Sequence, residues 1–148
     1  MVIREAKLDD IQILFDLRRD AEEDLRAGDA TEEIEMAKCK ADVSSGRGSC
    51  LVYEVGNKIA GFIYAQHVDE NDQATGRIRY LYVVPQHRGA AGAHLYEQCE
   101  RRLVEKGYSS IIFGTTPENF MIKEMGQRYG FHSIGRRGPL DFYAKALR

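Results

Sequence analysis

The chain has 148 residues, of which 21 are basic and 23 acidic, and a net charge of −2. This length suits one domain with a substantial core, so we expect a single domain over residues 1–148, and the balanced charge offers no electrostatic reason to bind nucleic acid. No apolar run approaches the length that spans a membrane, and the first residues lack the layout of a signal peptide, so a cytoplasmic location is expected. The three cysteines are widely spaced, which favours reduced thiols over a disulfide framework or a metal site.

Hydrophobic residues alternate along the chain between the strand period and the helix period, which predicts an α/β (α+β) fold. In the first half we expect a strand at Val2–Ala6, helices at about Asp9–Arg26 and Asp29–Val43, and strands at Cys50–Val55 and Ile59–Val68. The dipeptide Gly56-Asn57 suits the positive φ of a tight hairpin, and Ser44–Gly48 is expected to be a loop.

The second half continues the alternation of strands and helices. We expect a turn at Asp69–Asp72, strands at Arg77–Val84 and Ser109–Thr115, helices at about Gly89–Lys106 and Asn119–Tyr129, and closing strands at Phe131–Gly135 and Leu140–Ala146. Gly107 is placed to stop the first of these helices.

The junction after the strand at Arg77–Val84 is the most informative part of the sequence. The strand ends at Pro85, and a helix then begins among small residues, namely Gly89, Ala90, Ala91, Gly92 and Ala93. Unpaired N–H groups in the first turn of such a helix can bind an anion, and Arg88 could add a contact to a phosphate oxygen. The alternative is a tight strand-to-helix connection whose small residues only serve packing. A nucleotide P-loop is excluded because Gly92 is followed by Ala93 and His94 instead of Lys and Ser or Thr.

Gln86, Gly89 and Ala91 occupy the defined positions of the pattern Gln/Arg-x-x-Gly-x-Gly/Ala. The segment thereby resembles the acetyl-CoA pyrophosphate loop of the GNAT superfamily of N-acyltransferases. The opening Ile3–Ala6 and the closing segment from Asn119 to Phe131 are also similar to that family, and all three segments occur in the family's order.

The resemblance implies a mixed, mainly antiparallel sheet of about six to seven strands with about four helices, splayed between the fourth and fifth strands. It also implies acetyl-CoA as co-substrate, with the pantetheine arm paired to the fourth strand as though it were another strand. The cofactor-binding residues expected on this basis are Leu81, Tyr82, Val83, Arg88, Gly89, Ala90, Ala91, Gly92, Ala93 and Asn119. No metal is expected.

The catalytic residues of the family are only partly matched. Many members carry a glutamate on the fourth strand, where this chain has Arg77, Arg79, Tyr80 and Tyr82, and a tyrosine near the thiol, where this chain has Gly126. Tyr129, Tyr80 and Tyr82 are the nearest substitutes. Each has a plainer explanation: the first packs a helix end, and the other two cover one face of the sheet while Leu81 and Val83 face the other.

Other polar residues offer weaker candidates. Arg77 and Arg79 fit an exposed strand edge, or a site that attracts a substrate carboxylate. His87 and His94 are expected in solvent, whereas His67 or His132 could serve as a base. The acidic stretches Asp20–Asp24 and Glu32–Glu35 are expected to form solvated faces, although Glu22, Glu23, Asp24 and Asp29 could instead hold a cationic amine.

The function expected is an N-acetyltransferase that moves an acetyl group from acetyl-CoA to a primary amine of a small molecule, peptide or protein, by direct attack in a ternary complex. The alternative is a catalytically weak CoA-binding sensor or interaction module. The acceptor is expected to carry an amine beside an apolar or planar group, whereas an acceptor rich in carboxylates would require Arg77 or Arg79 to face inward. A homodimer is a possible assembly, and neither nucleic acid nor a membrane is an expected partner.

Overall fold

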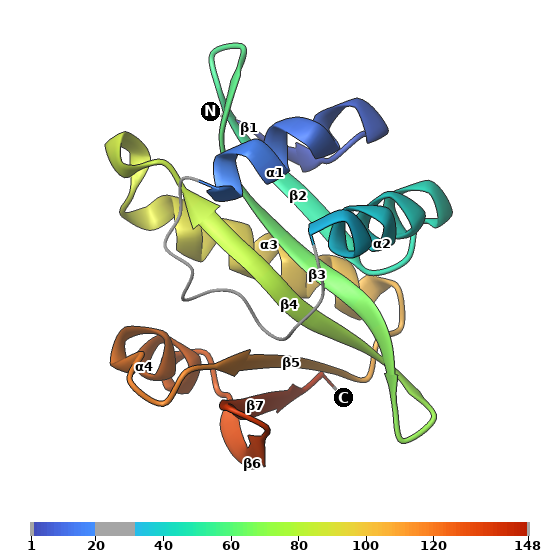
Figure 1. Ribbon diagram of the computed structural model, residues 1–148, viewed down its shortest axis with the longest axis vertical. Helices are drawn as coiled ribbons and strands as arrows, with labels where there is room; N and C mark the ends of the chain where they lie inside the picture. Colours follow the sequence, from blue (N-terminus) through green and yellow to red (C-terminus); the bar gives the residue numbers. More distant parts are fainter. Residues whose placement is uncertain (1, 20–31, 148) are drawn as a thin grey trace.

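The computed structural model describes residues 2–19 and 32–147 as a seven-stranded sheet with helices on both faces (Figure 1). The strands are β1 (Val2–Glu5), β2 (Ser49–Val55), β3 (Lys58–Glu70), β4 (Gln73–Val83), β5 (Ser110–Thr115), β6 (His132–Arg137) and β7 (Leu140–Ala146). The helices are α1 (Ile11–Arg19), α2 (Glu32–Ser45), α3 (Ala90–Glu105) and α4 (Phe120–Arg128), with short 3-10 turns at Leu8–Asp10 and Pro85–His87. The strand order is β1-β2-β3-β4-β5-β7-β6, and every pair is antiparallel except β4 with β5. The predicted mixed, mainly antiparallel sheet is confirmed.

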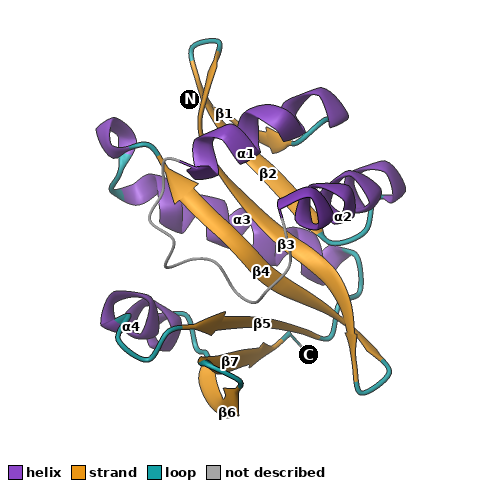
Figure 2. Cartoon of the chain, in the orientation of Figure 1, coloured by secondary structure: helices purple, strands orange, loops and turns teal. Residues whose placement is uncertain are grey.

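Helices α1 and α2 lie on one face of the sheet and α3 lies on the other (Figure 2). The central strands β2, β3 and β4 contribute alternate side chains to two apolar clusters, because successive side chains point to opposite faces. Leu81 and Val83 pack in the cluster under α3, whereas Tyr80 and Tyr82 pack with Phe15 in the cluster under α1 and α2. The predicted alternation along β4 is therefore confirmed.

Several element boundaries differ from the sequence prediction. Strand β4 begins at Gln73 instead of Arg77, because a two-residue turn at Asn71-Asp72, with φ of 53° and 65°, lets the hairpin with β3 pair from its tip. Helix α2 continues through Ser45, and β6 continues to Arg137. Residues 20–26 of the expected first helix, the expected helix start at Asp29 and the candidate carboxylates of Glu22, Glu23, Asp24 and Asp29 lie outside the described residues.

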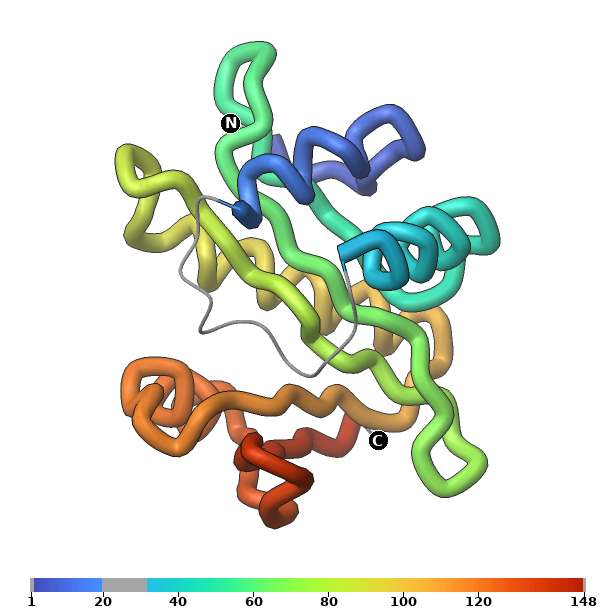
Figure 3. The backbone as a smooth tube through the Cα atoms, viewed as in Figure 1, coloured from blue at the N-terminus to red at the C-terminus, as the bar shows by residue number. Residues whose placement is uncertain are grey.

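Strand β4 has two irregularities, a β-bulge at Arg79 and an early end to its pairing with β5. The register with β3 shifts between Tyr64↔Tyr80 and Ala65↔Ile78, so Arg79 is an extra residue in a β-bulge. The pairing with β5 consists of Thr75↔Ser110, Gly76↔Ile111 and Arg77↔Ile112 and then stops. Beyond Arg77 the two strands diverge (Figure 3), which confirms the expected splay.

Candidate functional site

The β4–α3 junction forms a turn whose first helical N–H groups are not capped by a side chain. Gly89 precedes α3 with φ of 130° and ψ of −120°, a conformation that disfavours any residue with a Cβ. It supplies no side chain to the N–H groups of the first turn, so these donors and the positive end of the helix dipole are available to an anion. Arg88 is held beside the turn, because its Nε donates to the carbonyl oxygen of Val83 at 2.9 Å and its guanidinium lies over the Tyr82 ring.

The small residues of this turn have different roles. The methyl group of Ala91 is buried in the core cluster under α3. Gly92 has open space around it, since a Cβ built there would meet nothing within 4 Å. The sequence alone did not separate these two positions, yet only the second can be enlarged without disturbing the core.

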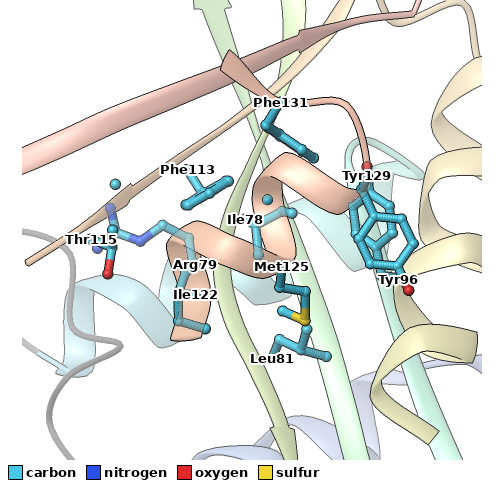
Figure 4. Close-up of a pocket in the computed structure, with 12 residues that line it drawn as sticks. Ile78, Arg79, Leu81, Tyr96, Phe113, Thr115, Ile122, Met125, Tyr129 and Phe131 are labelled. Carbon is cyan, nitrogen blue, oxygen red and sulfur yellow. The ribbon is translucent and has the colours of Figure 1, made fainter. Parts of the chain in front are cut away.

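A pocket of about 570 Å³ of empty space opens where β4 and β5 diverge (Figure 4). Strand β4 contributes Ile78, Arg79 and Leu81; β5 contributes Phe113, Gly114 and Thr115; α4 contributes Ile122, Met125 and Gly126; Tyr96, Tyr129 and Phe131 complete the lining. Most of these side chains are apolar or aromatic, and Arg79 and Thr115 are the exceptions at one end. A long, thin ligand can therefore lie between the strands with its polar groups on the backbone of β4.

Tyrosine rings close the other end of the pocket. The ring centres of Tyr96 and Tyr129 are 4.5 Å apart, and the Tyr96 hydroxyl donates to Glu100 Oε1 at 2.6 Å. Burial raises the pKa of the Tyr129 hydroxyl, so this phenol keeps its proton at neutral pH. Tyr80 and Tyr82, the other two candidate tyrosines, are buried on the opposite face and do not line this pocket.

A buried ion pair corrects two of the sequence-based expectations. Glu35 of α2 is only 2% exposed and Arg79 only 7%, and Arg79 Nη2 donates to Glu35 Oε1 at 2.7 Å. Glu35 is therefore not part of a solvated face, and Arg79 does not belong to an exposed strand edge. The physical reason is the β-bulge, which inserts Arg79 out of register with β3 and lets its guanidinium reach both α2 and the pocket.

Arg77 departs from the expected exposed edge as well. Its side chain is half-buried, with the guanidinium 5.0 Å from the centre of the Phe142 ring. Burial first, and the neighbouring charge of Arg79 second, lower the pKa of Arg77 to about 10. The chain thus keeps two guanidinium groups close together where the strands begin to separate.

Comparison with known proteins identifies the family. The sequence model of the acetyltransferase (GNAT) family matches residues 11–131. The chain belongs to this family. Among curated proteins, none matches the sequence significantly.

Solved structures share the GNAT fold over the whole chain. One is the PaiA N-acetyltransferase of Thermoplasma acidophilum in complex with coenzyme A, 19% identical, with a TM-score of 0.76 and 98% of each chain covered. Another is the ribosomal-protein-alanine N-acetyltransferase of Brucella melitensis, 20% identical, with a TM-score of 0.77 and 99% of each chain covered. The putative acetyltransferase YncA of Salmonella typhimurium with acetyl-CoA is 18% identical, with a TM-score of 0.75 over 100% of this chain and 94% of the other.

At helix α4, Asn119 agrees with the GNAT pattern, whereas Gly126 departs from it. Asn119 caps α4, because its Oδ1 accepts the N–H of Ile122 at 3.2 Å. Gly126 lies against the pocket wall, where an added Cβ would come within 2.9 Å of the Phe113 ring and 3.6 Å of Phe131. A tyrosine at position 126 would have to displace the rings of Phe113 and Phe131. The pocket wall is therefore packed differently here than it would be around a tyrosine.

Histidines, cysteines and metal ligands do not contribute to the pocket. His67 Nδ1 lies 2.7 Å from the Tyr108 hydroxyl, and none of the four histidines lines the pocket. The three cysteines are buried free thiols. Within residues 2–19 and 32–147, no group of three or more His, Cys, Asp or Glu is placed to hold a metal ion, and no helix in these ranges is long and apolar enough to cross a membrane.

The pocket contains residues that sequence reasoning missed. Tyr96, Phe113, Thr115, Ile122 and Met125 come from three separate elements, and they meet because α4 packs beside the diverging ends of β4 and β5. Helical spacing marks Tyr96 as a core residue, but nothing in the sequence pairs it with Tyr129. Glu35 was likewise indistinguishable from the exposed carboxylates around it.

Proposed function

We propose that this protein is an acetyl-CoA-dependent N-acetyltransferase that acetylates a primary amine by direct attack in a ternary complex. One observation carries the proposal: β4 separates from β5 beyond Arg77, and the resulting pocket is lined by Leu81 of β4 and Tyr96 of α3, the two elements that the uncapped turn at Gly89 joins. The same junction therefore offers an anion site and a slot for an extended arm.

The first turn of α3 suits the pyrophosphate of acetyl-CoA. The N–H groups of residues 88–93 lie at the positive end of a helix, and the small side chains of residues 89–93 leave room for an anion beside them. Arg88 stands next to this turn. The edge of β4 at Leu81–Val83 has no partner strand on the β5 side, so its backbone groups, apart from the Val83 carbonyl oxygen that accepts from Arg88 Nε, are available to the amides of the pantetheine arm. Asn119, which already caps α4, is the remaining cofactor contact that we infer from the family.

The pocket then orients the reacting groups. Acetyl-CoA supplies the activated acetyl group, and the apolar walls exclude water from it. A backbone N–H at the bulge around Arg79 is suited to stabilise negative charge that develops on the carbonyl oxygen during attack. Tyr129 lines the same pocket with a protonated phenol, and we assign to it a modest share in returning a proton to the departing thiolate.

The experiment measures acetyl-CoA binding by calorimetry and thiol release across an amine library. Gly89→Val should abolish binding, because valine cannot adopt the φ of 130° that shapes the turn. Gly56→Val is the matched control: Gly56 also has a positive φ, 64°, but lies in the β2–β3 turn with open space around it. This control variant should retain binding.

Three results are informative. Binding lost in Gly89→Val and kept in Gly56→Val, with thiol release for at least one amine, supports the proposal. Equal binding in both variants and the parent shows that the turn does not hold the cofactor. Tight binding without thiol release for any amine favours a CoA-binding sensor or interaction module instead.

A further inference from the structure

The polar end of the pocket holds more buried positive charge than negative charge. Arg79 is paired with Glu35, and the nearby Arg137 is paired with Glu70, with Nη2–Oε1 at 3.1 Å. Arg77 lies within electrostatic reach of all four of these groups, and it makes no ion pair with any residue in the described ranges. Within residues 2–19 and 32–147, these three guanidinium groups therefore share two carboxylates, which leaves one half-buried positive charge without an ion-pair partner in these ranges.

Unpaired polar atoms occur at the same end. Among the residues that the structure describes, the Nε atoms of Arg77 and Arg79, the Oγ1 of Thr115 and the Oε2 of Glu35 are buried without a hydrogen-bond partner, and of these four residues Arg79 and Thr115 line the pocket. Buried donors are nearly always bonded in folded proteins, so these atoms point to a missing ligand. Figure 4 shows Arg79 and Thr115 together at the end of the pocket away from Tyr96 and Tyr129.

We propose that the acceptor amine carries a carboxylate, and that Arg79, together with Thr115, binds this carboxylate at the polar end of the pocket while the neighbouring Arg77 adds positive charge. This inference rests on the proposed acetyl transfer and names its substrate class. A carboxylate supplies the acceptors and the negative charge that this end of the pocket lacks, because its two oxygens accept from guanidinium N–H groups and its charge balances the excess positive charge there. Glu35 holds Nη2 of Arg79 and so fixes the direction in which the remaining donors of the guanidinium point.

The alternative acceptor, a cationic amine without an acid group, fits this end less well. Its recognition would require negative charge near the acceptor, whereas the balance of charge around Arg77 is positive among the described residues. A carboxylate acceptor requires an arginine that faces inward, and Arg79 lines the pocket.

The test compares matched acceptors by thiol release from acetyl-CoA. Glycine, β-alanine and longer ω-amino acids are each paired with the corresponding carboxamide, which has nearly the same shape and no charge. We expect kcat/KM for the best amino acid to exceed that for its amide by about tenfold or more, the usual effect of a hydrogen bond to a charged group. The chain length that reacts best reports the spacing between amine and carboxylate.

Variants connect this preference to the two arginines. Arg77→Gln removes the unpaired charge, and the double variant Glu35→Gln/Arg79→Gln removes the buried pair without leaving a lone charge. In the double variant the preference should fall to within about twofold, because no guanidinium then lines the pocket to bind the acid group. In Arg77→Gln it should fall by a smaller factor, because Arg79 remains but is paired with Glu35. The control is Arg136→Gln, whose exposed guanidinium is paired with Asp141 outside the pocket lining, and which should keep the preference.

The outcomes separate this inference from the proposed function. Amides acetylated as well as amino acids, or a preference that survives in Arg77→Gln and the double variant, overturn the carboxylate site while acetyl transfer stands. Absence of acetyl-CoA binding overturns both. If thermal unfolding shows that the double variant is not folded, the comparison of Arg77→Gln with Arg136→Gln decides the matter alone.

Discussion

Replacing Gly92 with glutamate should stabilise the fold and destroy cofactor binding at the same time. Gly92 is the third residue of α3, and a side chain there meets no other atom within 4 Å. The new carboxylate would stand in the first turn of the helix, where the free N–H groups and the helix dipole favour negative charge. The pyrophosphate of acetyl-CoA is proposed to occupy the same field, so the two anions would compete.

The two effects have opposite signs and different sizes. A glycine replaced inside a helix gains roughly 0.5 kcal/mol from helix propensity, and the dipole adds about 0.3–1 kcal/mol. The free energy of unfolding should therefore rise by about 1 kcal/mol, which raises the Tm of a domain of this size by about 2–4 °C. A carboxylate about 5 Å from one phosphate charge costs about 3 kcal/mol at an effective dielectric constant of about 20, or on the order of a hundredfold in Kd.

Calorimetry with acetyl-CoA and a thermal unfolding scan measure both quantities on one protein sample. Gly92→Ala is the matched control, since it gains a similar helix propensity and adds no charge. The alanine variant should bind acetyl-CoA as the parent does. A Kd of Gly92→Glu within about threefold of that of Gly92→Ala would refute the placement of the pyrophosphate, because such a ratio amounts to less than 1 kcal/mol.

Three further predictions concern the Tyr129 hydroxyl, the pocket wall at Gly126 and the ion pair between Arg4 and Asp10. Tyr129→Phe should lower kcat by less than about tenfold; a loss of several hundredfold at unchanged affinity for acetyl-CoA would make Tyr129 a committed general acid. In Gly126→Ala the methyl group would meet the Phe113 ring at 2.9 Å, an overpacking cost of about 1–3 kcal/mol that outweighs the gain of up to about 1 kcal/mol in helix propensity, so Tm should fall; a Tm equal to or above that of the parent contradicts this packing. Hydrogen bonds from Arg4, the nearest at 2.8 Å, hold the pKa of Asp10 below its ordinary value of 3.8, so the contribution of Asp10 to stability is present above that pH and lost as the pH falls through the folded-state value. Asp10→Asn should accordingly lower Tm at neutral pH and reduce the additional loss in acid, and a variant with the same acid sensitivity as the parent argues against the pair.

Features that depend on neighbours in the chain could be predicted from the sequence. The turn at Gly89, the cap at Asn119 and the end of α3 at Gly107 each follow from the conformational limits or hydrogen-bonding groups of one or two residues. The alternation along β4 is equally local, since a strand places successive side chains on opposite faces.

Features that depend on packing between distant segments appeared only in the tertiary structure. A single extra residue in β4 turns Arg79 from a strand-edge position into a buried partner of Glu35, 44 residues earlier in the chain. Sequence patterns report the average environment of a charge, which for a glutamate on an acidic helix is solvent. Whether a given carboxylate instead meets a guanidinium in the core depends on the register of the sheet and on where the helix crosses it. For the same reason, the sequence of this protein determines the turn at Gly89 and the alternation along β4, while the tertiary structure alone decides which charges lie at the end of the pocket between the strands.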